Sequence, residues 1–93
     1  MYEISKEMYE LNINRLTNQI WKLIPMKEHD EDWSGQLTTV LIELTGLGVV
    51  INQQKQFIPL ISKLEGLKNG EWEFREYRKT VFECISLLRE IRL

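Results

Sequence analysis

The stretch Trp33–Gln54, WSGQLTTVLIELTGLGVVINQQ, decides the fold, and Glu43 is its only formally charged residue. Ile42 and Val49 lie on the side of this helix opposite the main apolar stripe. That stripe shows the spacings of three and four that are typical of an amphipathic helix, at Leu37, Val40, Leu41, Leu44, Leu47 and Ile51. A helix that is apolar on two sides has to be covered from at least two directions, by other helices of the chain or by another chain.

The ends of this central helix are marked less clearly than its middle. Asp32 or Ser34 is placed to cap its beginning, and the acidic residues before it suit the positive end of the helix dipole. The helix is predicted from about Ser34 to Leu47, and to Ile51 if the glycines at 46 and 48 do not end it. Because the region is rich in β-branched residues, a short extended piece at Val49–Ile51 is the alternative.

A first helix precedes the central one. It is predicted from Ser5, which can serve as its N-cap, to Ile24, and Pro25 is predicted to end it. Its apolar stripe consists of Tyr9, Ile13, Leu16, Ile20, Leu23 and Ile24.

Two more helical patterns follow the central helix. The third helix extends over residues 57–67, with Pro59 tolerated only in its first turn. The fourth begins at Glu71 or Trp72 and continues to Arg92. One face of the fourth helix is apolar over roughly five turns, at Phe74, Tyr77, Val81, Cys84, Ile85, Leu88 and Ile91.

Together the four patterns predict an all-α fold, a small four-helix bundle that forms a single helical domain over residues 1–93. The first and last helices should each be about 30 Å long, and the central pair about 20 Å. Two long outer helices around a shorter central pair leave apolar surface uncovered at one end, so we expect the bundle to be oligomeric.

Charge and composition exclude several classes of function. The net charge is −2, with −3 over residues 1–32, +1 over 33–70 and 0 over 71–93. No part carries the basic excess that binding to phosphate backbones requires, so nucleic acid is not favoured as a partner. The sequence begins without the basic and apolar regions of a signal peptide, and Leu37–Ile51 is too short to span a bilayer. We expect a cytoplasmic protein without a membrane partner.

The chain shows no set of residues that suggests catalysis. His29 is the only histidine and has no cysteine near it, so a zinc site or a nucleophile–histidine pair lacks its usual members. Cys84, the only cysteine, falls on an apolar stripe and is expected to be buried. We therefore expect a protein that is not an enzyme and has no cofactor, no bound metal and no small-molecule substrate.

The acidic segment Asp30–Leu37 fits part of an EF-hand calcium loop. Such a loop needs oxygen ligands at its first, third and fifth positions, glycine at the sixth and glutamate at the twelfth. Asp30, Asp32, Ser34 and Gly35 fit, but Leu41 stands at the twelfth position. We expect an acidic turn that caps the next helix, and calcium binding is the alternative.

Trp33-Ser34-Gly35, placed between two helices, resembles the W-x-G turn of the small secreted helical-hairpin proteins exported by type VII systems. The resemblance covers these residues and the chain length. That family has a long unbroken second helix, which Pro59, Gly66 and Gly70 would interrupt here, and Val81 stands where its tail signal has an acid. We do not assign the chain to that family.

Six apolar residues lie off the predicted buried stripes and are the candidate interface: Met8, Leu11, Trp21, Ile42, Val49 and Trp72. Tryptophan and methionine are enriched in the centres of protein interfaces, whereas packing over loops within a monomer is the alternative. We predict a non-catalytic protein that binds another protein, itself as a homodimer or a larger target, as a regulator, inhibitor or assembly subunit.

The alternative function is that of a helix-turn-helix-like DNA-binding regulator. The third helix would then enter the major groove and should carry arginine, lysine, asparagine or glutamine toward the bases. It offers only Lys63 and Lys68, with Glu65 between them.

Overall fold

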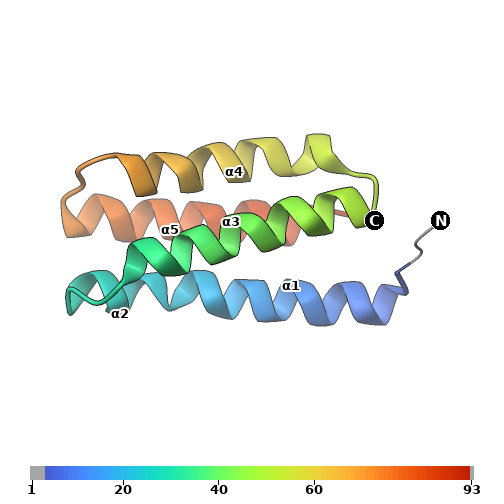
Figure 1. Ribbon diagram of the computed structural model, residues 1–93, viewed down its shortest axis with the longest axis horizontal. Helices are drawn as coiled ribbons and strands as arrows, with labels where there is room; N and C mark the ends of the chain where they lie inside the picture. The colour runs from blue at the N-terminus through green and yellow to red at the C-terminus, as the bar shows by residue number, and fades with distance from the viewer. Residues whose placement is uncertain (1–3, 93) are drawn as a thin grey trace.

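The computed structural model describes residues 4–92, and within them the chain forms a four-helix bundle without strands (Figure 1). The first arm of the bundle consists of α1 (Lys6–Trp21) and α2 (Leu23–Glu28), which follow one another. The other arms are α3 (Trp33–Val50), α4 (Gln54–Asn69) and α5 (Phe74–Glu90). The all-α bundle predicted from the sequence is confirmed.

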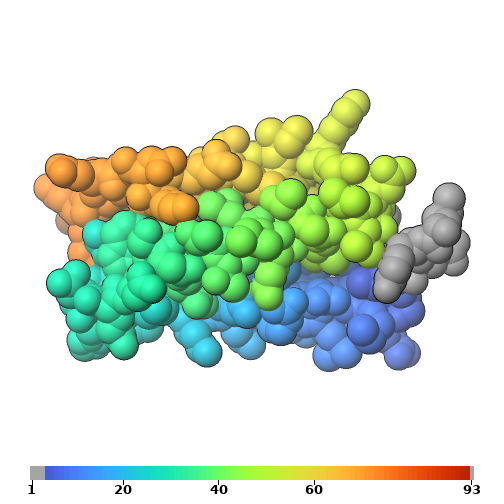
Figure 2. All heavy atoms as spheres, in the orientation of Figure 1, coloured from blue at the N-terminus to red at the C-terminus, as the bar shows by residue number. Residues whose placement is uncertain are grey.

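The arms form a ring of neighbours in which α1 contacts α3 and α5, and α4 also contacts α3 and α5. The helices α3 and α5 therefore lie diagonally across the bundle, as do α1 and α4. In Figure 2, α3 lies across the front face between α1 and α4. The core between the arms is apolar, and its largest fully buried side chains are Tyr77, Phe57, Leu16, Ile20, Leu23, Leu37, Leu44, Leu60, Leu64, Leu67, Leu88 and Val40.

The prediction that Pro25 ends the first helix is wrong. The chain leaves the helix only at Lys22 and resumes it as α2, with Pro25 inside that short helix. Proline has no N–H to donate to the carbonyl of residue 21, and its ring crowds that carbonyl, so a break three residues earlier relieves the strain. Leu23 and Ile24 are buried, and this burial holds α2 in place after the break.

The sequence predicts that the helix α3 ends at Leu47 or at Ile51, and the observed helix is close to the longer of these two forms. It continues through Gly46 and Gly48 to Val50, so the alternative of an extended Val49–Ile51 is wrong. A Cβ built at Gly48 would lie 2.9 Å from the Phe57 ring and 3.6 Å from the Gln54 Cα. Glycine at 48 thus allows α3 and α4 to approach closely, and this packing offsets the weak helix propensity of the region.

The helix α4 also begins earlier than predicted, at Gln54, so Pro59 lies inside it rather than in its first turn. Pro59 is exposed, so water can bond the carbonyl of Lys55, which loses its helical partner. With 18 residues in α3, 16 in α4 and 17 in α5, the arms are more equal in length than expected.

Side chains fasten the end of the bundle at which α1 and α4 begin and α5 ends (Figure 1). Ser5 caps α1 as predicted, since its Oγ accepts from the N–H of Met8 at 3.1 Å. The Tyr9 hydroxyl donates to the carbonyl of Ile91 at 2.9 Å, and this bond is buried. The Gln56 amide bonds both the carbonyl and the N–H of Arg92, at 2.8 and 3.1 Å. The last residues of the described chain are therefore fastened to α1 and α4.

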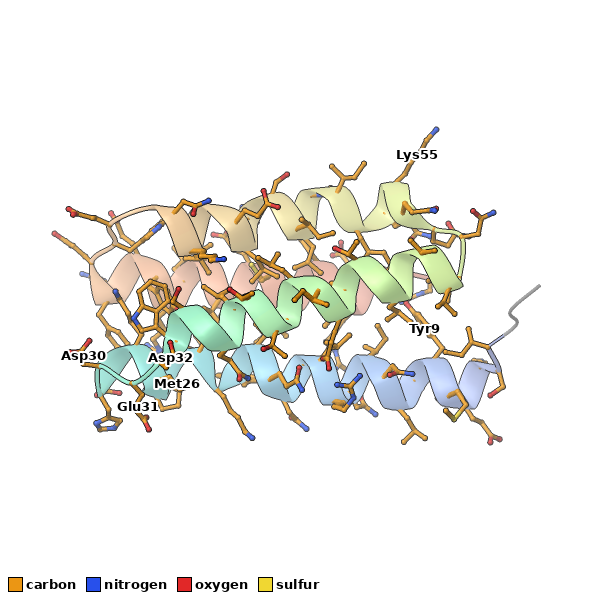
Figure 3. The ribbon with its side chains drawn as sticks, viewed as in Figure 1. Tyr9, Met26, Asp30, Glu31, Asp32 and Lys55 are labelled. Atoms are coloured by element: carbon orange, nitrogen blue, oxygen red, sulfur yellow. The ribbon has the colours of Figure 1, made fainter. Side chains whose placement is uncertain are left out.

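The acidic turn before α3 caps that helix, as expected, and Asp32 is the capping residue. Its Oδ1 accepts from the N–H of Gly35 at 3.0 Å, whereas Ser34 lies inside the helix. A Cβ at Gly35 would meet the Asp32 carboxylate, so glycine at 35 makes room for the cap. The backbone of Asp30 has a φ of 54°, which turns the chain from α2 toward α3 (Figure 3).

An Asp32→Ala variant should lower the free energy of unfolding by about 1 kcal/mol, because one helix N–H loses its partner. Asp32→Asn should keep most of the stability, since an amide oxygen caps almost as well. Urea unfolding followed by circular dichroism measures both. Added calcium should leave the wild-type midpoint unchanged, and a rise in the midpoint with calcium would favour the calcium loop over the cap.

Candidate interaction surface

From Thr39 to Val49 the outward side of α3 carries no formal charge, whereas the Asp32 carboxylate lies against its first turn at Gly35. Gly35, Thr39, Ile42, Gly46 and Val49 follow one another at alternating spacings of four and three, which place them on one side of a helix. Ile42 is 68% exposed and Val49 59% exposed. A Cβ built at Gly46 would meet nothing within 4 Å. Small and apolar side chains therefore alternate along an open stripe.

The one charge of α3 is directed to a neighbouring helix. Glu43 forms an ion pair with Arg15 of α1, with 2.8 Å between Oε2 and Nη1. Arg15 also donates to the Oδ1 of Asn12 at 3.0 Å. The carboxylate is thus partnered at the α1–α3 seam, and the outward stripe stays neutral.

Apolar residues of the two neighbouring helices flank this stripe. On α1, Leu11 and Met8 precede Arg15 by one and two turns, and they are 64% and 53% exposed. On α4, the Cα of Gln54 lies 3.6 Å from a Cβ built at Gly48 of α3. Ile58 follows Gln54 by one helical turn, and 57% of its surface is exposed. We call the outward stripe of α3 together with Met8, Leu11 and Ile58 the α3 face.

Four of the six predicted interface residues are exposed on the two helices that contribute to the α3 face, Met8 and Leu11 on α1 and Ile42 and Val49 on α3. The other two residues lie elsewhere. Trp21 is 43% exposed on the side of α1 toward α5, where it packs edge-to-face on Phe82 with ring centroids 4.8 Å apart. Trp72 is half-buried, and its Nε1 donates to the carbonyl of Gly66 at the end of α4. Trp72 therefore closes a helix end within the chain.

Four exposed apolar side chains were not among the predicted candidates: Val50, Ile58, Phe74 and Phe82. Phe74 was assigned to the buried stripe of its helix, but it is the first residue of α5 and is 37% exposed. Ile58 directly follows the buried Phe57, and Phe82 directly follows the buried Val81. One residue along a helix is a rotation of about 100°, so these two side chains are directed about 100° away from the core. That offset was the only signal in the sequence that could have identified them.

Cys84 is fully buried, as predicted. Burial raises the pKa of its thiol from 9.0 to about 12, so it stays protonated and unreactive at neutral pH. Tyr77 is also fully buried, its hydroxyl has no hydrogen-bond partner among the described residues, and burial raises its pKa well above 10. Neither group is placed to act on a bound molecule.

The rest of the described chain offers little for chemistry. His29 is exposed at the end of α2. Residues 4–92 contain no group of three or more histidine, cysteine or acidic side chains that could hold a metal ion. Within the same residues, no helix is both long and apolar enough to cross a membrane.

Comparisons with known proteins give no relative. No family model, curated protein or solved structure matches the chain.

Proposed function

We propose that this protein is a non-catalytic interaction protein that self-associates through the α3 face and acts as a regulator, inhibitor or assembly subunit in the cytoplasm. The observation that carries the proposal is the outward side of α3 from Thr39 to Val49, which is neutral and carries the exposed Ile42 and Val49. Contiguous apolar patches of this kind on small proteins mark sites of protein association.

The absence of charge on the α3 face favours a second copy as the partner. In a twofold-symmetric dimer the same patch faces itself, so a charged residue near the axis would meet its own copy and repel it. Glu43 is directed to Arg15 instead. Threonine at 39 and glycine at 46 are exposed and leave room for another helix to approach α3 closely.

The size of the bundle suits such a dimer. Its extents are 42 × 21 × 20 Å. One broad side therefore offers on the order of 800 Å², which is about the area each partner buries in an interface of standard size. The exposed side chains of Met8, Leu11, Ile42, Val49 and Ile58 would supply its apolar centre.

The DNA-binding alternative gains no support from the arrangement of the helices. The two helices of a helix-turn-helix motif cross at roughly 90–120°. Here α3 and α4 contact one another and run side by side along the bundle (Figure 1).

Ile42→Glu tests the proposal. A carboxylate at the centre of the α3 face would be buried twice in a symmetric dimer, so the dissociation constant of the dimer should rise by about a hundredfold or more. Sedimentation equilibrium measures the constant. Ile42 is 68% exposed, so the fold of a single copy should be unaffected.

Ser86→Glu is the matched control, because Ser86 is exposed on α5, diagonally across the bundle from α3. It should leave the dimer intact. A wild-type protein that sediments as a monomer at about 100 μM, or equal effects of the two substitutions, would contradict the proposal.

A further inference from the structure

A second surface, on the far side of the bundle from α3, concentrates positive charge. Arg75, Arg78, Phe82, Ser86 and Arg89 follow one another on α5 at spacings of three and four, and all five are exposed. They lie along the side of α5 that faces α1, since Phe82 packs on Trp21. We call this stripe and the adjoining residues of α1 the basic face.

Two open hollows lie along the basic face. One, of about 640 Å³, lies between the beginning of α1 and the end of α5, with an apolar floor of Tyr9, Ile13 and Ile91. The other, of about 480 Å³, lies over the first half of α5 beside Phe82. Lys6, Arg75, Arg78, Lys79, Arg89 and Arg92 line the two hollows, against the acids Glu10 and Glu76. Half of the twelve lysines and arginines of a chain with net charge −2 are therefore gathered here.

Helix stability accounts for Arg89, in the last turn of α5, but not for the cations at the beginning of that helix. Arg75 stands in the first turn of α5, where the helix dipole favours negative charge, and Arg78 and Lys79 follow close behind. The ion pairs formed within residues 4–92 are Arg15–Glu43 and Lys63–Glu83, and neither involves a residue of the basic face. The Arg92 guanidinium donates to the carbonyls of Arg89 and Ile91, and the other cations of this face have no ion-pair partner within residues 4–92.

The aromatic pair between the hollows adds an apolar anchor. Trp21 packs edge-to-face on Phe82, and the Arg78 guanidinium lies 5.3 Å from the centre of the Phe82 ring. Tryptophan and arginine are the residues that most often dominate binding energy at interfaces. With these two neighbours the Phe82 ring is still 37% exposed, so it can contact an apolar group of a partner.

We propose that the basic face binds an acidic amphipathic segment of another protein, independently of self-association. Carboxylates of the segment pair with the cations along α5, and its apolar side chains contact Trp21, Phe82 and the floor of the larger hollow. From Arg75 to Arg92 the face extends about 25 Å, which matches a helical segment of about 17 residues. The bundle then has two surfaces, one for its own copy and one for an acidic target.

The test uses a labelled helical peptide of about 18 residues, with glutamates on one side and leucine and phenylalanine on the other, followed by fluorescence anisotropy. The protein should bind it saturably, and the same peptide with glutamine for glutamate should bind at least tenfold more weakly. Arg78→Glu and Arg89→Glu should each weaken binding about tenfold. Arg78→Gln should have an intermediate effect, and circular dichroism verifies that each variant is folded.

Lys55→Glu is the matched control, since it makes the same change in net charge at an exposed position on α4, where Lys55 points away from the body of the bundle (Figure 3). It should weaken binding less than twofold. An equal loss with Lys55→Glu, no saturation at millimolar peptide, or tighter binding of a single-stranded oligonucleotide would each overturn the proposal. The Ile42→Glu variant should bind the peptide normally, so a failure of one surface is separable from a failure of the other.

Discussion

A Phe57→Ala variant is expected to lose about 3–5 kcal/mol of unfolding free energy. Phe57 is only 1% exposed and lies against Gly48, so it fills the space where α3 and α4 approach most closely. Removing the ring leaves a cavity that two rigid helices cannot close. Urea unfolding at a fixed protein concentration, with an unchanged dependence on denaturant, measures the loss.

The close approach also makes the effect of Gly48→Ala depend on residue 57. In the wild-type chain the new methyl group would lie 2.9 Å from the Phe57 ring, so overpacking should destabilise the protein by about 1–2 kcal/mol. In the Phe57→Ala background the same substitution should stabilise by up to about 1 kcal/mol, since alanine favours the helix and the clash is gone. A stabilising Gly48→Ala in both backgrounds would show that the helices do not touch there.

Alkaline pH should destabilise the bundle, beginning near pH 9. Burial raises the pKa of Cys84 from 9.0 to about 12, so between these values the unfolded chain releases a proton that the folded chain keeps. The contribution of the thiol to stability is complete below pH 9 and decreases by up to about 1.4 kcal/mol for each pH unit above it. Burial also raises the pKa of Tyr77 above 10, which adds a second loss of the same sign from pH 10 upward.

Urea unfolding at pH 8, 9 and 10 of the wild type and of Cys84→Ala separates the two groups. From pH 9 to 10 only the thiol contributes among these two groups, so the variant should lose less stability over that interval than the wild type. The comparison concerns the slope with pH, because the substitution also changes packing at neutral pH. Equal slopes for the two proteins would mean that water reaches the thiol in the folded state.

The sequence predicted the features that depend on periodicity within one helix. The buried stripes of the four arms, with the exception of Phe74, follow from spacing and residue type, as do the cap at Ser5 and the burial of Cys84, and the structure confirms them. The exposure of Ile42 and Val49 agrees with a helix that is apolar on two sides.

Features that depend on contacts with a second helix could not be predicted from the sequence. Pro25 was predicted to end a helix and Pro59 to lie in the first turn of one. Packing against neighbouring arms allows helical structure to continue past both residues. Gly48 looked like a helix end because the sequence does not show that Phe57 packs against it. The basic face could not be predicted for a similar reason. Its cations come from α1 and from both ends of α5, so the net charge of consecutive residues does not show it.

The bond between the Tyr9 hydroxyl and the Ile91 carbonyl joins residues that are 82 positions apart. During synthesis the ribosome releases Tyr9 long before Ile91, so this bond and the clasp of Gln56 on Arg92 form only after translation has passed the last arm. Until then the apolar sides of the first three arms are exposed in the nascent chain. The bundle is thus completed only after residues 91 and 92 have left the ribosome, and the interval before that is when the chain most needs protection from aggregation.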